Sequence, residues 1–212
     1  MSINPDHIKS PTRVALFGGT FDPPHLGHLA IARAAADAFQ LDTILFAPAG
    51  RQPLKPAGSS ASFADRLAMV TLACTADTRF APSTLDAPIP GGEPNFTVET
   101  LRRLNQSLPA ATIFNLVGAD SFHGLARWRR PDELLNLAEW IVVSRPGFPL
   151  RDPEGMTLTP AHRQRIHLLD SVHMDAAATD LREHLQAGDL CKDLLPVLVA
   201  EYIHQHGLYR RI

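Results

Sequence analysis

The chain has 212 residues, 45% of them hydrophobic and 20% charged, and its formal net charge is -2. This composition suits one domain with an ordinary buried core, and the lack of a clustered basic excess argues against a nucleic-acid partner. Cys74 and Cys191 lie far apart, which argues against a disulfide framework and a cysteine-based zinc site. No apolar run has the length of a signal peptide or a membrane span, so we expect a cytoplasmic protein without a membrane partner.

Residues 1–12 read as a polar tail, and the regular pattern begins after them. The apolar run 13–18, stopped by glycines, predicts a buried strand. Alanines and leucines at helical spacing follow over 26–41, and the β-branched run 42–49 predicts the next strand. This strand–helix–strand order indicates a βαβ unit and a mainly parallel sheet.

The alternation of strands and helices continues along the rest of the chain. Further strands are predicted at 111–120, 140–147 and 165–170, and further helices at 63–74, 95–108, 131–140, 179–188 and 195–207. The last two helices each end at a glycine, the preferred C-terminal signal. Pro- and Gly-rich loops span 48–62, 87–95 and 145–160. Long loops in a compact α/β domain often contact substrate.

The stretch 17–28, FGGTFDPPHLGH, joins the first predicted strand to the first predicted helix. Gly18 and Gly19 allow backbone amides to approach a phosphate closely, and the helix that follows offers its positive N-terminal end. His25 and His28 are three apart, so their imidazoles can face the same side. The stretch has neither the Gly-Lys-Ser/Thr of a Walker loop nor the glycine spacing of the dinucleotide fingerprint.

The spacing of these residues leaves three interpretations open. A cationic histidine is disfavoured at a helix N-terminus, and a bound phosphate would reverse that penalty, so a polyphosphate cradle is one interpretation. Half of a metal site is the second, although no third ligand is obvious. The third is a surface turn with capping residues, because turns use glycine constantly.

The stretch 17–28 closely resembles the GGTFDPxHxGH signature of the HxGH-type nucleotidyltransferase superfamily, and more narrowly the bacterial nicotinate-nucleotide adenylyltransferases. The resemblance runs from about Val14 to Tyr209 and includes, in the family's order, GADSFHGLARWRRPDELL, VVSRPGF, TDLREHL and VLVAEYIHQHGLY. It implies an α/β fold, a Rossmann-like mainly parallel sheet with helices on both faces, in a single domain over 13–212 that includes the C-terminal helices 179–207.

The resemblance also implies a reaction and its participants. Members of the family transfer AMP from ATP to nicotinate mononucleotide, which gives deamido-NAD and pyrophosphate in NAD biosynthesis, with Mg²⁺ carried by the ATP phosphates. The attacking phosphate oxygen is already ionised at neutral pH, so no general base is needed. Catalysis can then come from aligning two anions and neutralising charge. On this basis His25 and His28 are expected to contact the ATP phosphates and to stabilise the transition state.

Other residues take roles from their places in the family's motifs. Those expected to bind ATP are Gly18, Gly19, Thr20, Phe21, Lys55, Asp120, Arg145, Thr179 and Arg182. Those expected to bind the acceptor nucleotide are Phe96, Thr97 and Trp128. Ordinary structural roles stay open for several of them: Lys55 could be a solvated loop lysine, Trp128 a core residue, and Phe96 and Thr97 a capped helix start.

The chain departs from the family pattern at two places. Ala176, Ala177 and Ala178 stand where the second phosphate motif usually carries hydroxyls, whereas Thr179 and Arg182 remain. One neutral hydrogen bond contributes only about 0.5–1.5 kcal/mol, and helix amides and a guanidinium bind a phosphate more strongly than such a hydroxyl. We therefore expect weakened or rearranged ATP contacts in an active enzyme. Leu54 replaces the histidine that often precedes the motif lysine.

Other functions stay open from the sequence. Within the same fold, the acceptor could be nicotinamide mononucleotide or phosphopantetheine. The three alanines would also suit an impaired nucleotide-binding protein, and the two histidines a zinc hydrolase. The sequence leaves the oligomeric state undecided and is compatible with a homo-oligomer.

Overall fold

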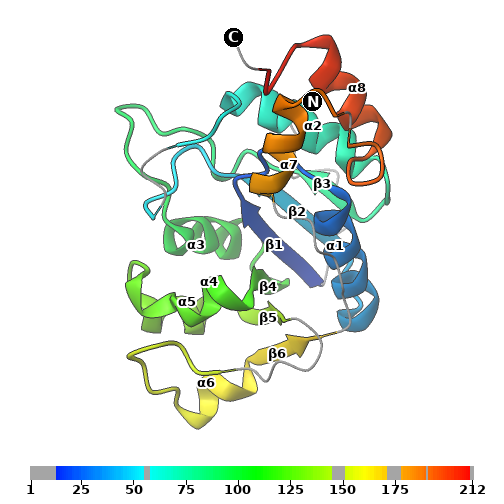
Figure 1. The fold of residues 1–212 in the computed structure, drawn as a ribbon. Helices are drawn as coiled ribbons and strands as arrows, with labels where there is room; N and C mark the ends of the chain where they lie inside the picture. The colour runs from blue at the N-terminus through cyan, green and yellow to red at the C-terminus, as the bar shows by residue number, and fades with distance from the viewer. Residues whose placement is uncertain (1–12, 55–57, 145–150, 171–177, 190, 211–212) are drawn as a thin grey trace.

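The computed structural model describes residues 13–54, 58–144, 151–170, 178–189 and 191–210. A six-stranded sheet forms its centre, in the order β3-β2-β1-β4-β5-β6 (Figure 1), and every neighbouring pair is parallel. The strands are β1 (Arg13–Gly19), β2 (Thr43–Pro48), β3 (Phe80–Pro82), β4 (Thr112–Gly118), β5 (Glu139–Val143) and β6 (Ile166–Leu169). The strand order reverses between β1 and β4, which creates a switch point at their carboxyl ends.

Helices cover both faces of the sheet. One face packs against α1 (Leu26–Phe39), α2 (Phe63–Cys74), α7 (Ala178–Gln186) and α8 (Val197–Gln205). The other packs against α3 (Thr97–Ser107), α4 (Ala119–His123), the short 3-10 turn η2 (Leu125–Arg127) and α5 (Pro131–Leu137). The remaining helix, α6 (Pro160–Gln164), directly precedes β6. Among the described residues, no helix combines the length and apolarity needed to cross a bilayer.

The burial of β1 on both faces explains why residues 13–18 form a continuous apolar run. Ala15 and Phe17 join the core on the α1 face, whereas Val14 and Leu16 join the core on the α3 face. A parallel strand that is buried on both faces carries apolar residues at consecutive positions. The Rossmann-like α/β fold expected from the sequence is therefore confirmed, with a sheet that is wholly rather than mainly parallel.

The ends of the helices follow the signals in the sequence. Ser62 caps α2 by accepting a hydrogen bond from the backbone N–H of Asp65. Gly188 and Gly207 follow α7 and α8 with φ of 89° and 61°, the left-handed conformation that glycine adopts without a Cβ penalty. The two glycines predicted to end the last helices therefore do so.

Some boundaries differ from the prediction for local reasons. The strand expected over 111–120 ends at Gly118, and α4 begins at Ala119. No pattern in the sequence predicts β3, which has three residues and ends in a proline. The helix α6 was not predicted either; it begins at the last residue of the predicted loop 145–160, and Thr159 caps it by accepting a hydrogen bond from the N–H of His162.

Candidate functional site

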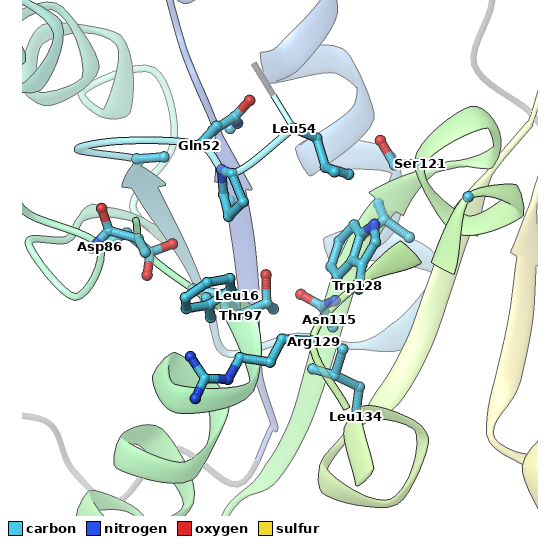
Figure 2. Close-up of a pocket in the computed structure, with 18 of the residues that line it drawn as sticks. Leu16, Gln52, Leu54, Asp86, Thr97, Asn115, Ser121, Trp128, Arg129 and Leu134 are labelled. Atoms are coloured by element: carbon cyan, nitrogen blue, oxygen red, sulfur yellow. The ribbon is translucent and has the colours of Figure 1, made fainter. Parts of the chain in front are cut away.

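A cavity of about 360 Å³ opens at the carboxyl ends of β1 and β4, where the strand order reverses (Figure 2). Its walls come from the end of β1, residues 49–54 after β2, the start of α3, and the segment 124–129 between α4 and α5. Ligands of open α/β sheets bind in this position, because the crossover connections diverge there and leave a crevice.

The cavity brings together residues that the sequence assigned to both substrates. They are Gly18 and Gly19 at the end of β1, Phe96 and Thr97 at the start of α3, Asp120 in the first turn of α4, and Trp128 after η2. Trp128 is half-buried, and its ring centroid lies 6.2 Å from that of Trp140. It therefore packs on the core and lines the cavity at the same time.

The paired histidines do not line this cavity. They follow Gly18 and Gly19 in the chain, where β1 passes into α1. His25 is the N-cap residue of α1, and its backbone N–H donates to Nδ1 of His28 at 3.2 Å. The two ring centroids are 3.7 Å apart. Because Nδ1 of His28 accepts a hydrogen bond, the hydrogen of its neutral ring sits on Nε2. The two imidazoles therefore share a side, as their spacing predicts, and the His28 ring caps the N–H of His25. The interpretation as a surface turn is wrong, because His25 is only 6% exposed.

Burial keeps both imidazoles neutral. Desolvation lowers the pKa of His25 from its ordinary 6.5 to about 4. Desolvation also lowers the pKa of His28 well below its ordinary value, and the neighbouring His25 ring lowers it further. Nδ1 of His25 is buried and has no hydrogen-bond partner within the described residues. An anion placed beside these rings would raise both pKa values.

A third ligand for a metal ion is missing from the described part of the chain around these histidines. No group of three or more His, Cys, Asp or Glu side chains is placed there, or elsewhere among the described residues, to hold a metal ion. The pair is instead surrounded by aromatic side chains. The Phe21 ring packs edge-on against His28, with centroids 5.0 Å apart.

The loop before α1 is held in place by a buried carboxylate. Asp22 is only 4% exposed and accepts hydrogen bonds from the backbone N–H groups of Ser60 and Ala61, at 2.6 and 3.0 Å. The Tyr209 hydroxyl donates to the same carboxylate at 2.7 Å. Phe21, just before it, has a φ of 49°, which a residue with a side chain adopts only where its surroundings hold it. These contacts fix the shape of the loop that carries the motif.

A buried arginine of α2 also holds this loop in place. Arg66 is 1% exposed and donates to the backbone carbonyl oxygens of Thr20, Ala49 and Ala61, at 2.7, 2.8 and 3.4 Å. It therefore connects the motif, the end of β2 and the segment before α2. The Thr20 hydroxyl oxygen is buried and finds no partner among the described residues. The sequence carries no signal for this role of Arg66, because a lone arginine in a helix reads as a solvated side chain.

The second phosphate motif reaches the first through Arg182. Its guanidinium donates to the backbone carbonyl oxygen of Asp22 at 2.9 Å and to the Thr179 hydroxyl at 3.3 Å. Figure 1 shows α7, which carries both residues, near the carboxyl end of β1. The structure thus brings Thr179 and Arg182 to the motif loop, although neither lines the cavity.

Several predicted positions cannot be compared with the structure. Lys55, Arg145, Ala176 and Ala177 lie outside the described residues. Leu54, the residue before the motif lysine, is 54% exposed and lines the cavity.

The cavity also contains polar residues that were not predicted from the sequence. Asn95 and Asn115 line it and are buried, and so is Asp86, whose carboxylate accepts a hydrogen bond from the Thr100 hydroxyl. Burial raises the pKa of Asp86. Arg129 lies over the Phe96 ring, 4.7 Å from its centroid. Short-range patterns give no signal for these contacts, because each depends on segments distant in the sequence.

Asn95 connects two loops at the edge of the cavity. Its Oδ1 accepts from the backbone N–H of Arg51 at 3.0 Å, and its Nδ2 donates to the carbonyl oxygen of Ala87 at 2.9 Å. A Cβ on Gly50 would lie 2.5 Å from the backbone nitrogen of Pro88, so only glycine permits this approach of the two loops. The loop after β2 and the loop before α3 therefore form one wall.

Known proteins resemble the chain over most of its length. A family model described as Cytidylyltransferase-like matches residues 16–184. A protein of Gloeobacter violaceus, named "Probable nicotinate-nucleotide adenylyltransferase", is 42% identical over 199 residues, which cover 93% of this chain and 96% of the relative. A protein of the same name from Roseiflexus sp. is 39% identical over 201 residues, which cover 95% of this chain and 100% of the relative.

The fold also resembles solved structures. The structure of Plasmodium falciparum nicotinic acid mononucleotide adenylyltransferase complexed with NaAD aligns with a TM-score of 0.72 and covers 93% of this chain and 97% of that chain. Its sequence identity is 15%, so this likeness supports the fold alone.

Proposed function

The chain belongs to the cytidylyltransferase-like family and, within it, to the nicotinate-nucleotide adenylyltransferases, and on this premise we propose that it transfers AMP from ATP to nicotinate mononucleotide. The products are deamido-NAD and pyrophosphate, so the enzyme contributes to NAD biosynthesis. An oxygen of the acceptor phosphate bonds to the α-phosphorus of ATP, while the bond from that phosphorus to the bridging oxygen of pyrophosphate breaks.

One observation carries this proposal: a single cavity is lined both by the motif glycines and by the aromatic acceptor residues. Gly18 and Gly19 line it together with Thr97 and Trp128. A phosphate bound at the motif and a pyridine ring bound beside Trp128 would therefore share one space. This arrangement supports the alignment of two substrates, which can supply a large part of the rate acceleration.

The histidine pair suits the charge that develops in the transition state. Nε2–H of His28 is a donor whose tautomer is fixed by the hydrogen bond to Nδ1. Pre-oriented donors in a buried site stabilise developing negative charge more strongly than donors in water. We assign this role to His25 and His28, with phosphate contacts from the amides of residues 18–21, from Thr179 and Arg182, and from Lys55. We assign adenosine contacts to Asp120 and Arg145.

Mg²⁺ enters the proposal as part of the ATP substrate. It would neutralise charge on the departing pyrophosphate. The chain's own contribution is then to bind and align the Mg²⁺–ATP complex through amides, imidazoles and a guanidinium.

The acceptor assignment rests on Phe96, Thr97 and Trp128. Thr97 starts α3, and the positive N-terminal end of a helix favours a negative group. This favours a carboxylate over a carboxamide on the pyridine ring. The near-neutral net charge supports two nucleotides as partners rather than a nucleic acid, and we propose that the reaction takes place in the cytoplasm.

The test is turnover with alternative acceptors. The protein is incubated with ATP, Mg²⁺ and either nicotinate or nicotinamide mononucleotide, and pyrophosphate is followed. We expect a higher kcat/KM with the acid than with the amide. Measurable ATP binding without pyrophosphate would reject the proposal in favour of a nucleotide-binding protein, and faster turnover of the amide would reject the acceptor.

A further inference from the structure

Asn115 is a polar residue in the middle of an apolar sheet. It lies in β4 directly between Leu16 of β1 and Trp140 of β5, its partners in register. Its neighbours on the same face, Ile113 and Val117, belong to the core beneath α3 and α5. Asn115 itself is 2% exposed. A central position of a parallel sheet is normally apolar, so the asparagine requires a reason.

No partner among the described residues satisfies the side-chain nitrogen. Nδ2 of Asn115 is buried and makes no hydrogen bond within them. The indole N–H of the adjacent Trp140 already donates to the carbonyl oxygen of Leu134, so it does not pair with the Asn115 side chain. A buried amide donor left unpaired costs about 1–3 kcal/mol, and buried polar groups normally have a partner, so this unpaired donor points to a functional reason.

The cavity supplies a place for that partner. Asn115 lines it together with Leu16, Leu134 and Trp128, and Figure 2 shows the Asn115 amide between the Trp128 ring and Leu134. The apolar and aromatic side chains around it are suited to a flat ring. Rotation about Cβ–Cγ exchanges the two amide atoms, so an N–H of Asn115 can be presented to a group inside the cavity.

The direction in which a ligand would enter the cavity determines which of its groups lies next to Asn115. Gly18, Gly19 and Gly118 lie at the carboxyl ends of β1 and β4, and Asn115 lies three residues deeper along β4. A mononucleotide acceptor keeps its phosphate near Gly18 and Gly19, where the transfer takes place. Its ring then points inward, and the polar group at the far side of the ring comes nearest to Asn115.

We propose that Asn115 is a specificity-determining residue whose side-chain amide donates a hydrogen bond to the carboxylate on the acceptor's pyridine ring. The inference rests on the proposed function and adds a residue to it. Hydrogen bonds to charged acceptors are stronger than those to neutral ones, so the amide favours a carboxylate over a carboxamide. Asn115 contacts the far end of the acceptor and no reacting atom, so its effect falls on recognition.

Replacement by leucine separates a ligand-binding role from a structural one, because the two roles predict opposite signs for stability. Asn115→Leu keeps the number and branching of the side-chain heavy atoms and removes the unpaired donor, so unfolding of the ligand-free protein should occur at the same or a higher denaturant concentration. The KM for nicotinate mononucleotide should rise about 10- to 100-fold, the range for a lost hydrogen bond to a charged group. The KM for ATP should stay within about twofold.

Two further variants complete the experiment. Asn95→Leu is the matched control, because Asn95 is a buried cavity asparagine whose hydrogen bonds are all made within the protein. It should unfold at a lower denaturant concentration. Asn115→Asp places an anion near the carboxylate, so kcat/KM should fall more for the acid than for the amide mononucleotide.

The outcomes separate this inference from the proposed function. If wild-type protein releases pyrophosphate but Asn115→Leu keeps the wild-type KM for nicotinate mononucleotide, the inference is wrong and the function stands. A loss of stability with equal increases in both KM values would assign Asn115 a structural role and also overturn it. If wild-type protein shows no turnover, the proposed function fails, and calorimetric binding of nicotinate mononucleotide decides the inference: equal Kd values for wild type and Asn115→Leu would refute it.

Discussion

Arg182 donates a hydrogen bond to the backbone carbonyl oxygen of Asp22 at 2.9 Å, across 160 positions of the sequence. The contact joins the start of α7 to the histidine motif. The two hydrogen bonds that Arg182 makes within the described part of the chain go to neutral oxygen atoms. Its positive charge therefore remains available to an anion bound beside the motif. The two hydrogen bonds also hold the guanidinium in place, so that the side chain does not have to be ordered when the anion binds.

Replacing Arg182 should weaken ATP use more than acceptor use. Arg182→Lys keeps the charge but loses the planar fork, and Arg182→Gln loses both. A charge-assisted hydrogen bond contributes about 1.5–3 kcal/mol, so we expect kcat/KM for ATP to fall about 10- to 100-fold in Arg182→Gln and less in Arg182→Lys. Steady-state kinetics with each substrate varied would measure this. The exposed Arg163, paired with Asp152, provides the control Arg163→Gln. Equal effects of the two glutamine variants would contradict the assignment.

His28 should be required for turnover more than for folding. Glutamine at this third helical position can still accept a hydrogen bond from the N-cap N–H, as in a capping box. It lacks the Nε2–H donor that the imidazole ring places on its far side. Loss of one pre-oriented donor to a developing charge typically lowers turnover about 10²- to 10³-fold. We expect His28→Gln to lower kcat by this factor with little change in the urea unfolding midpoint. His184→Gln, on the exposed side of α7, should keep kcat. Unchanged turnover in His28→Gln would refute its role.

The stability of the ligand-free protein should fall as the pH falls from 6.5 to 4. Burial lowers the pKa of His25 to about 4, below the 6.5 of the unfolded chain, so the unfolded state binds the proton first. The contribution is fully present above pH 6.5 and is lost towards pH 4. The lowering of the pKa corresponds to about 3 kcal/mol, and His28 acts in the same direction.

Urea unfolding at pH 7.5 and 4.5 checks this expectation. Wild-type protein should lose more free energy of unfolding between the two pH values than His25→Gln. The exposed His204 supplies the control His204→Gln, which should behave like wild type. An identical pH dependence in wild type and His25→Gln would show that His25 is not buried as a neutral ring.

Asn95 should affect stability and both substrates together. Asn95→Ala leaves the N–H of Arg51 and the carbonyl oxygen of Ala87 without their partners, which costs about 1–3 kcal/mol of unfolding free energy. Because the wall it holds borders the cavity, KM should rise several-fold for both ATP and the acceptor. Chemical denaturation and steady-state kinetics measure the two effects. Asn136→Ala removes an exposed side chain whose hydrogen bond, among the described residues, goes to the nearby carbonyl oxygen of Asp132, and should change neither.

Much of the fold could be predicted because its signals are local. The run around Leu16 is apolar at consecutive positions since both faces are buried, and Gly188 and Gly207 mark helix ends. The strand Phe80–Pro82 could not be predicted, because three residues carry no period and the strand is defined by its backbone pairing with β2, which is distant in the sequence. The place of His25 at the start of α1 likewise follows from the sequence, whereas its contact with a phosphate stays a prediction.

The rest of the site depends on tertiary contacts. Asn115 reads as an interruption of an apolar strand, and its importance appears only when Leu16 and Trp140 flank it in the sheet. Asn95 reads as a residue before a helix, whereas its partners belong to two distant loops. Sequence spacing gives an expectation for the phosphate site, whereas the shape of a cavity between four segments is set by packing.

Adenylyl transfer is tested by following the α-phosphorus of ATP. Protein, Mg²⁺, nicotinate mononucleotide and ATP labelled at the α-phosphate are incubated, and the labelled products are separated. We predict that all transferred label appears in deamido-NAD, with one pyrophosphate released per dinucleotide formed. Label that remains in ATP although ATP is bound, or that appears only as free AMP, would contradict adenylyl transfer at this site.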